Sequence, residues 1–192
     1  MKWSSVLLVA LLGLVVAVGV INCGESNHGP GSDGMANTGS RMEITHLMAS
    51  SGTGAANTFI QDISVDSTTT TQFDSGFDVT VECLGATQGA NPTTGITLET
   101  YDVVCNSSAP GSVPIGPLTK MTLNDYITPS GKLEIKGLAF FTAEAKRQWL
   151  SDGGNINLEP PYQCKVTLHG VNDFGYEMTA VGSFNILVGW FP

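Results

Sequence analysis

Residues 162–188, YQCKVTLHGVNDFGYEMTAVGSFNILV, alternate between apolar and polar side chains on both sides of a single turn. The apolar set takes every second position: Tyr162, Cys164, Val166 and Leu168 before the turn, and Tyr176, Met178, Ala180, Gly182, Phe184, Ile186 and Val188 after it. A period of two is that of a β-strand with one buried face. Between the two runs, Asn172-Asp173-Phe174-Gly175 supplies a glycine where a tight turn needs a positive φ. This segment predicts a long β-hairpin.

Five further runs have the alternation or composition of strands: residues 43–47, 58–65, 77–83, 96–105 and 132–141. Within residues 96–105 the alternation changes phase near Thr100, which indicates a β-bulge. About seven short strands with closely spaced turn signals predict an all-β fold, an immunoglobulin-like antiparallel β-sandwich. Because no Trp lies in residues 96–105, an antibody-type domain is not implied.

One short helix is predicted in a connection between strands. Thr142 is suited to cap it, residues 143–150 are good helix formers, and Gly153 is placed to end it.

Residues 1–40 have the pattern of an exported, lipid-anchored protein. Lys2 precedes an apolar run, residues 6–21, that holds no charged residue, and Cys23 follows almost directly. Residues 24–40 are then mostly Gly, Ser, Asn, Pro and Asp. We therefore expect a lipoprotein signal peptide at residues 1–22, a lipidated Cys23 with a flexible linker at residues 23–40, and one sandwich domain at residues 41–192. Two or three acyl chains hold a protein firmly, where one binds only marginally.

Asn22 is not the small residue that usually precedes a lipidated cysteine, so two alternatives stay open. One is ordinary signal cleavage, for which Ala17-Val18-Gly19 is the nearest A-x-A-like site. The other is an uncleaved anchor helix near the short end of what spans a bilayer. All three interpretations place the bulk of the chain outside the cytoplasm. Gly24 stands where an Asp signals inner-membrane retention in many Gram-negative bacteria, and therefore favours the outer membrane.

The excess of acidic residues bears on which partners the chain could bind. The sequence has 17 acidic and 8 basic residues, a formal charge of −9, and 13% charged residues overall. An acidic surface argues against binding nucleic acid or anionic headgroups. We expect the chain to contact the membrane through its N-terminal lipid and to have a protein partner in the cell envelope.

Three cysteines remain in the exported domain once Cys23 is set aside, so one disulfide at most forms and one thiol is left. If residues 96–105 and 162–171 are neighbouring antiparallel strands, Cys105 lies beside Cys164 and a bridge between them is favoured. The pairing Cys83–Cys164 and three buried, reduced cysteines are the alternatives. No Cys-x-x-Cys motif or Cys/His cluster supports a zinc site.

The segments ITLETYDVV (96–104), AEAKRQWL (143–150) and VTLHGVNDFGYEMTAVGSFNILVGWF (166–191) resemble a group of uncharacterised bacterial lipoproteins with a single immunoglobulin-like β-sandwich. The resemblance covers most of the exported domain. It implies the sandwich fold and the anchor, and it brings no activity with it. The Asp-x-x-Gly-Asn turn of that group appears here as Asp173-Phe174-Gly175-Tyr176, without the Asn.

Candidate catalytic residues are few. Of the three histidines, His28 lies in the linker and His46 near the first strand, which leaves His169 as the candidate for a Ser-His-Asp triad. No Gly-x-Ser-x-Gly motif accompanies it, and we interpret it as a solvent-facing strand residue. The acids available for glycoside hydrolysis are interpreted as scattered surface residues: Asp125, Glu134 and Glu144.

Two binding hypotheses also have a structural alternative. Asp173 could join Asp152, Glu159 or Glu177 around Ca²⁺, but no calcium-loop motif is present and a role in shaping the turn is favoured. The aromatic residues singled out are interpreted as core or edge-covering rather than ligand-gripping: Phe140, Phe141, Trp149, Trp190 and Phe191. We expect neither a metal nor a cofactor.

The sequence thus predicts a non-enzymatic, membrane-anchored lipoprotein that serves as a binding or scaffolding module in the cell envelope. An envelope hydrolase acting on glycans or peptides is one alternative. A carrier of a small ligand or of calcium is the other. Sandwich folds host many functions, so the fold favours binding only weakly.

Overall fold

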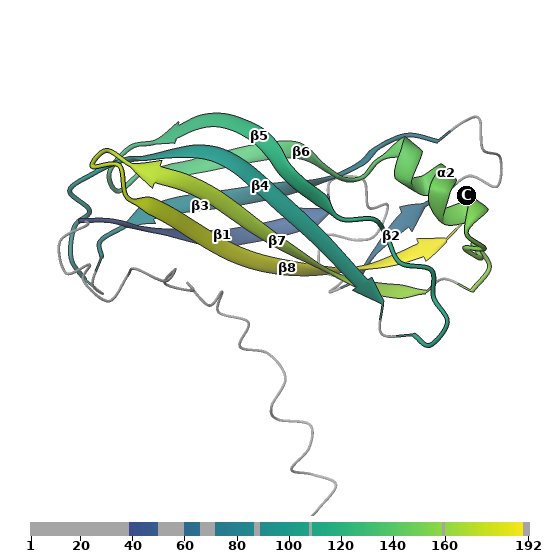
Figure 1. Cartoon of the computed structure of the whole chain (residues 1–192). Helices are drawn as coiled ribbons and strands as arrows, with labels where there is room; N and C mark the ends of the chain where they lie inside the picture. Colours follow the sequence, from purple (N-terminus) through teal and green to yellow (C-terminus); the bar gives the residue numbers. More distant parts are fainter. Residues whose placement is uncertain are drawn as a thin grey trace, which may run out of the picture.

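The computed structural model describes residues 39–49, 60–65, 72–86, 89–107, 109–158 and 160–189. Within these ranges the chain forms an elongated two-layer sandwich with one helix at its end (Figure 1). The elements in chain order are β1 (Arg41–Ala49), β2 (Ile60–Ser64), β3 (Ser75–Leu84), β4 (Ile96–Ser107), β5 (Leu118–Ile127), β6 (Lys132–Phe141), α2 (Ala143–Ser151), β7 (Pro161–Asn172) and β8 (Glu177–Gly189).

One layer is a three-stranded sheet in the order β1-β3-β6, and the other is a five-stranded sheet in the order β2-β8-β7-β4-β5. β2 runs parallel to β8, and the other pairs are antiparallel. This division of strands is that of an immunoglobulin-like sandwich, with β4, β7 and β8 in the places of strands C, F and G. The predicted all-β sandwich with one short helix is confirmed.

The β7–β8 hairpin matches the prediction, except that Tyr176, expected on the buried face, is exposed. Its register runs from Pro161 opposite Leu187 to Val171 opposite Glu177. Gly175 in the turn has a φ of 80°, which a side chain would disfavour. The alternation seen in the sequence places the even-numbered residues of both strands toward the other sheet.

β4 lies between β5 and β7, and its register shifts between Leu98 and Thr100 against both neighbours. This is the bulge indicated by the sequence. The shift returns Tyr101, Val103 and Cys105 to the buried face.

β5 is the strand that the sequence did not predict. It forms one edge of the larger sheet, and only Leu123 and Ile127 among its residues are buried. Lys120 has a φ of 54°, so the strand is irregular near its start. An edge strand with two buried side chains lacks the regular alternation by which its neighbours were recognised.

Helix α2 begins and ends where expected. The Thr142 hydroxyl accepts a hydrogen bond from Ala145 N at 3.2 Å, and Asp74 Oδ1 accepts one from Ala143 N at 2.7 Å. Two side chains thus satisfy N–H groups that the first turn leaves without helical partners. Gly153, with a φ of 95°, follows the last turn.

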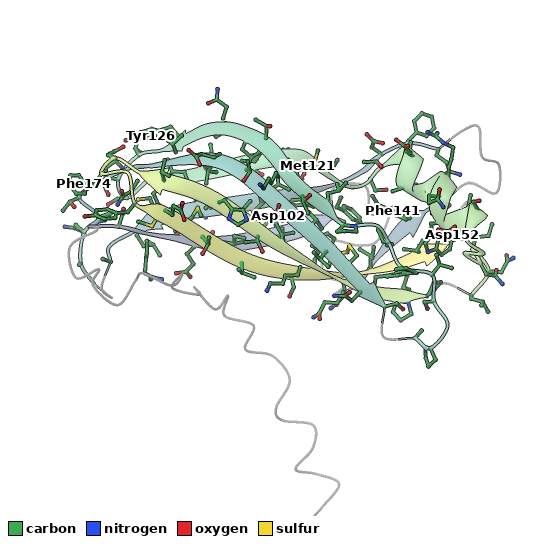
Figure 2. All side chains as sticks on the ribbon, in the orientation of Figure 1. Asp102, Met121, Tyr126, Phe141, Asp152 and Phe174 are labelled. Atoms are coloured by element: carbon green, nitrogen blue, oxygen red, sulfur yellow. A yellow bond between two sulfur atoms is a disulfide. The ribbon has the colours of Figure 1, made fainter. Side chains whose placement is uncertain are left out.

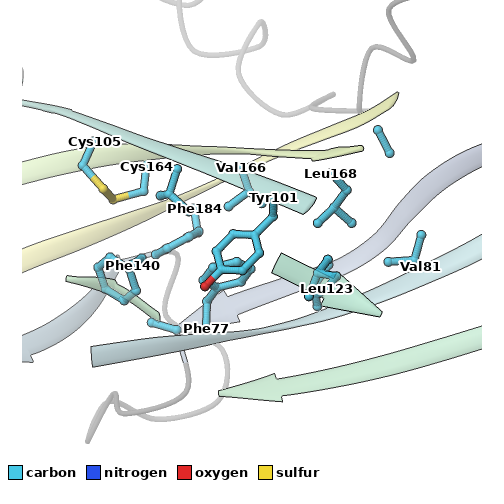
Figure 3. Packing of buried hydrophobic residues seen from close by; sticks show 14 of the residues in the cluster. Phe77, Val81, Tyr101, Cys105, Leu123, Phe140, Cys164, Val166, Leu168 and Phe184 are labelled. Carbon is cyan, nitrogen blue, oxygen red and sulfur yellow. A yellow bond between two sulfur atoms is a disulfide. The ribbon is translucent and has the colours of Figure 1, made fainter. Parts of the chain in front are cut away.

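Aromatic rings from both sheets meet in the core (Figure 3). Phe77 of β3 lies 5.7 Å from Tyr101 of β4 and 5.8 Å from Phe184 of β8, measured between ring centroids. Phe140 of β6 packs edge-on against Phe184 at 5.1 Å. The Tyr101 hydroxyl donates to Ala139 O at 3.1 Å, so a polar contact also joins the layers.

Cys105 and Cys164 form a disulfide within the five-stranded sheet, the pairing that the sequence favoured. The two residues are direct cross-strand partners on β4 and β7. In antibody domains the bridge instead joins the two sheets. Cys83, at the end of β3, is a buried free thiol.

The N-terminal segment is tied to the sandwich before the first strand. Gly39 O accepts a hydrogen bond from Thr93 N at 3.0 Å, and the buried Ser40 hydroxyl lies 2.6 Å from that of Thr94. The contacts of the domain therefore begin no later than Gly39, two residues before the boundary predicted at Arg41. The predicted signal peptide and Cys23 lie outside the described residues. No helix in the described ranges is long and apolar enough to cross a membrane.

Candidate functional site

The two ends of the sandwich differ in what they expose. The end that carries Gly39, Gly95 and the β7–β8 turn is called the turn pole here, and the end that carries α2 and the start of β7 is called the helix pole. Figure 2 shows Tyr126 and Phe174 at the turn pole, and Phe141 and Asp152 toward the helix pole.

Asp173 fixes the β7–β8 turn against the loop that precedes β4. Its backbone N donates to Gly95 O at 3.2 Å, and its Oδ2 accepts from Gly95 N at 2.7 Å. The Tyr126 hydroxyl, from β5, donates to the same carboxylate at 3.2 Å. A Cβ at Gly95 would collide with that hydroxyl, so only glycine fits under it. Three segments distant in the sequence therefore meet at one carboxylate.

Asn172 shapes the turn itself. The residue is buried, and its Oδ1 accepts hydrogen bonds from Phe174 N at 3.1 Å and Tyr176 N at 3.0 Å. The backbone of Gly175 donates to Asn172 O at 2.8 Å, and Asn172 N donates to Tyr176 O at 3.0 Å. These bonds hold the turn in one conformation.

The rigid turn presents large apolar side chains to solvent. Phe174 is 61% exposed, Tyr176 is 46% exposed, and the neighbouring Tyr126 is 49% exposed. None of the three was singled out in the sequence as a binding residue. A phenylalanine inside a tight turn, between Asp and Gly, was the available signal, because a turn residue has no neighbouring strand to cover it.

The pKa of Tyr126 is raised from its ordinary value. Partial removal of its hydroxyl from water contributes most, and the hydrogen bond to the Asp173 carboxylate adds to it. The phenol therefore keeps its proton, and can donate to Asp173, to a higher pH than an ordinary tyrosine.

His169 lies on the outer face of the five-stranded sheet, as expected, and pairs with an acid there. Its Nε2 lies 3.0 Å from Asp102 Oδ2, while Asp102 Oδ1 accepts from Lys120 N at 2.6 Å. The bond from the Lys120 backbone is the main reason that the pKa of Asp102 is lowered, and His169 contributes. Within the described part of the chain, His169 makes no hydrogen bond to a hydroxyl, so the nucleophile of a Ser-His-Asp triad is not brought to it.

The acids considered for calcium are not brought together. Asp173 lies at the turn pole and Asp152 caps α2 at the helix pole, where its carboxylate accepts from Gln148 Nε2 at 2.8 Å. Glu177 begins β8, four residues after Asp173 in the sequence, and Glu159 lies outside the described residues. The described residues hold no group of three potential metal ligands.

The acids considered for glycoside hydrolysis occupy three elements. Asp125 is on β5, Glu134 on β6 and Glu144 on the first turn of α2. Glu134 pairs with Lys136 at 3.2 Å on the exposed face of the smaller sheet.

The helix pole carries a shallow pocket of about 150 Å³. Three stretches form it: the β4–β5 loop, the end of α2 with the residues after it, and the start of β7. Its lining consists of Ala109, Pro110, Gly111, Ser112, Val113, Trp149, Gly153, Gly154, Asn155, Leu158, Pro160 and Pro161, none of them a carboxylate or a histidine. Leu158 is 73% exposed at its edge.

Trp149 and Tyr162 hold the pocket wall in place. Trp149 Nε1 donates to Val113 O at 3.2 Å and to the Tyr162 hydroxyl at 2.9 Å, and that hydroxyl donates to Val113 O at 2.6 Å. Gly154 packs against the indole so closely that a Cβ would overlap it. Burial is the main cause that raises the pKa of Tyr162.

The predicted aromatic residues divide into two groups. Phe140, Phe141 and Trp149 are buried, as interpreted from the sequence. Trp190 and Phe191 lie outside the described residues. Beside Phe141, the buried Lys146 places its Nζ 5.7 Å from the ring centroid, and desolvation lowers its pKa to about 8 although Asp74 acts in the opposite direction.

No protein-family model and no curated protein matches this chain. Among solved structures, the chain is similar to one described as "X-ray structure of Northeast Structural Genomics Consortium target SoR45", with 11% sequence identity and a TM-score of 0.37. That match covers 78% of this chain and 86% of the other. A likeness at this level carries no argument about function.

Proposed function

We propose that the chain is an exported lipoprotein, anchored through Cys23, that acts as a non-catalytic binding module in the cell envelope. The observation that carries the proposal is the run of apolar residues 6–21 followed by Cys23 and a Gly- and Ser-rich segment. That segment precedes Gly39, which lies at the turn pole. An anchor at Cys23 would therefore be attached at the turn pole, and the helix pole would be the opposite end of the sandwich.

The helix-pole pocket is the surface that best suits a protein partner. At about 150 Å³ it is smaller than the ~300–1,000 Å³ typical of small-molecule sites. Prolines and an exposed leucine surround it, and the Trp149–Tyr162–Val113 hydrogen bonds keep it preformed. A preformed apolar hollow of this size suits a side chain of a partner protein.

The anchor is tested by the intact mass of protein extracted from its native membrane, with Cys23→Ala in parallel. The proposal expects loss of residues 1–22, added acyl mass on Cys23, and release of the Cys23→Ala variant from the membrane. An unmodified N-terminus near residue 23 on a freely soluble chain would refute the anchor.

The partner site is tested separately by photo-crosslinking in cells. A photoreactive amino acid at Leu158 is expected to give a discrete adduct with an envelope protein. The same group at Lys136, which is exposed on β6 and does not line the pocket, is the control. Equal adduct patterns at both positions would remove the pocket from the proposal.

A further inference from the structure

We propose that the turn pole contacts the lipid interface of the membrane that anchors the chain, with Phe174 and Tyr176 as the side chains that enter it. This inference rests on the proposed anchor at Cys23. It adds a second, non-covalent contact that would set the orientation of the sandwich on the membrane.

The exposed aromatic side chains of the turn are presented by a rigid backbone. Phe174 and Tyr176 are 61% and 46% exposed, while the amide N–H groups of both are held by Asn172 Oδ1. Asp173 ties the same turn to Gly95 through two hydrogen bonds. Because the turn is already ordered, little conformational entropy is lost when its side chains enter another phase.

The position of the turn relative to the anchor is the reason for proposing a bilayer as the surface that it contacts. Thr93 N donates to Gly39 O and Asp173 N donates to Gly95 O, so the entry of the N-terminal segment and the aromatic turn share one pole. Fifteen residues, 24–38, separate Cys23 from Gly39, and the sixteen steps between these two residues span at most about 58 Å. A bilayer that holds Cys23 therefore lies within reach of this pole.

The chemistry of the pole fits the headgroup region of a bilayer. Tyrosine combines an apolar ring with a polar hydroxyl and is enriched at membrane interfaces, and a phenylalanine reaches the acyl boundary beside it. The chain has a formal charge of −9, which argues against attraction by anionic lipid. The contact is therefore apolar, suits zwitterionic lipid, and is insensitive to salt.

The test uses the full mature chain reconstituted in phosphatidylcholine vesicles that contain brominated acyl chains. Phe174→Trp introduces a fluorescent reporter at the turn pole. Phe73→Trp, at a 79% exposed position next to the N-terminus of α2, is the matched control at the helix pole. Flotation of the vesicles records the anchor independently of the fluorescence. The wild-type spectrum is subtracted from both variants.

The expected result is that brominated lipid quenches the fluorescence added by Phe174→Trp, at low and at high salt, and leaves that of Phe73→Trp unchanged. If the protein floats with the vesicles but neither reporter is quenched, the turn-pole contact is wrong and the anchor stands. If the protein does not float, the anchor fails first. If the turn reporter is shielded from an aqueous quencher in native membranes only, a protein or glycan occupies the pole and the lipid proposal is overturned.

Discussion

Asp173 and Gly95 exchange two hydrogen bonds across the turn pole, one from backbone to backbone and one from the Gly95 amide to the Asp173 carboxylate at 2.7 Å. The carboxylate also accepts from Tyr126. We expect Asp173→Ala to destabilise the domain by about 1 kcal/mol, since a part-buried amide loses its acceptor. Urea unfolding gives the free energy, and hydrogen exchange at Gly95 gives the local effect. Glu134→Ala, which removes an exposed acid, is expected to have almost no effect.

The disulfide gives a second prediction. The bridge closes a loop with a sequence separation of 59 residues. Replacing both Cys105 and Cys164 by Ser is expected to reduce the free energy of unfolding by about 4 kcal/mol in the chain-entropy model. Denatured, unreduced protein should expose the Cys83 thiol and no other from the described residues. Detection of three thiols from Cys83, Cys105 and Cys164 would show that the bridge does not form.

The buried tyrosines predict a loss of stability in alkali. Burial is the main cause that raises the pKa values of Tyr101 and Tyr162. The folded state then keeps protons that the unfolded state releases as the pH rises above about 10, so stability falls through that range. Urea midpoints measured from pH 8 to 11 should decline less steeply in Tyr101→Phe and Tyr162→Phe. An unchanged slope in the double variant would contradict this account.

Lys146 predicts a pH dependence of the opposite sign. Its pKa in the folded state is about 8, because desolvation disfavours the ammonium, against an ordinary value of 10.5. Between these two values the unfolded chain binds the proton more tightly, so folding stability rises with pH and the contribution levels off outside the window. Relative to Lys146→Met, wild-type protein should therefore gain stability from pH 8 to 10.5. A constant difference between the two proteins across this window would refute it.

Much of the sandwich was predictable because a period of two survives in its central strands. β7 and β8 bury alternate residues along nearly their whole length, and the phase change near Thr100 marked the bulge in β4. β5 was not predicted from the sequence, because Leu123 and Ile127 are its only buried residues. An edge strand forms because it pairs with the strand beside it, and this pairing leaves no regular pattern in its own residues.

The candidate surfaces were harder to anticipate than the fold. In the sequence, Phe174 is an ordinary turn residue. The hydrogen bonds that the Asn172 and Asp173 side chains accept show that the turn is fixed, and its ring is exposed. The pocket at the helix pole joins the β4–β5 loop to residues some forty positions later, and the hydrogen bonds of Trp149 and Tyr162 to Val113 O hold these segments together. The partnership of His169 with Asp102 likewise depends on the register of two strands.

The Cys83 thiol lies far from the Cys105–Cys164 disulfide, and this separation protects the disulfide from exchange with that thiol. Cys83 Sγ donates to Thr94 O at 3.3 Å, just before β4 begins. Cys105 lies near the other end of that strand, nine residues after Ile96 and so about 30 Å from the start of β4 at the usual rise per residue. Burial raises the pKa of the Cys83 thiol, so little thiolate forms. Thiol–disulfide exchange needs a thiolate in contact with a sulfur of the bond. Among the cysteines of the described residues, exchange between Cys83 and the bridge therefore has to wait for unfolding, and the bridge is kinetically protected from this thiol for as long as the sandwich is closed.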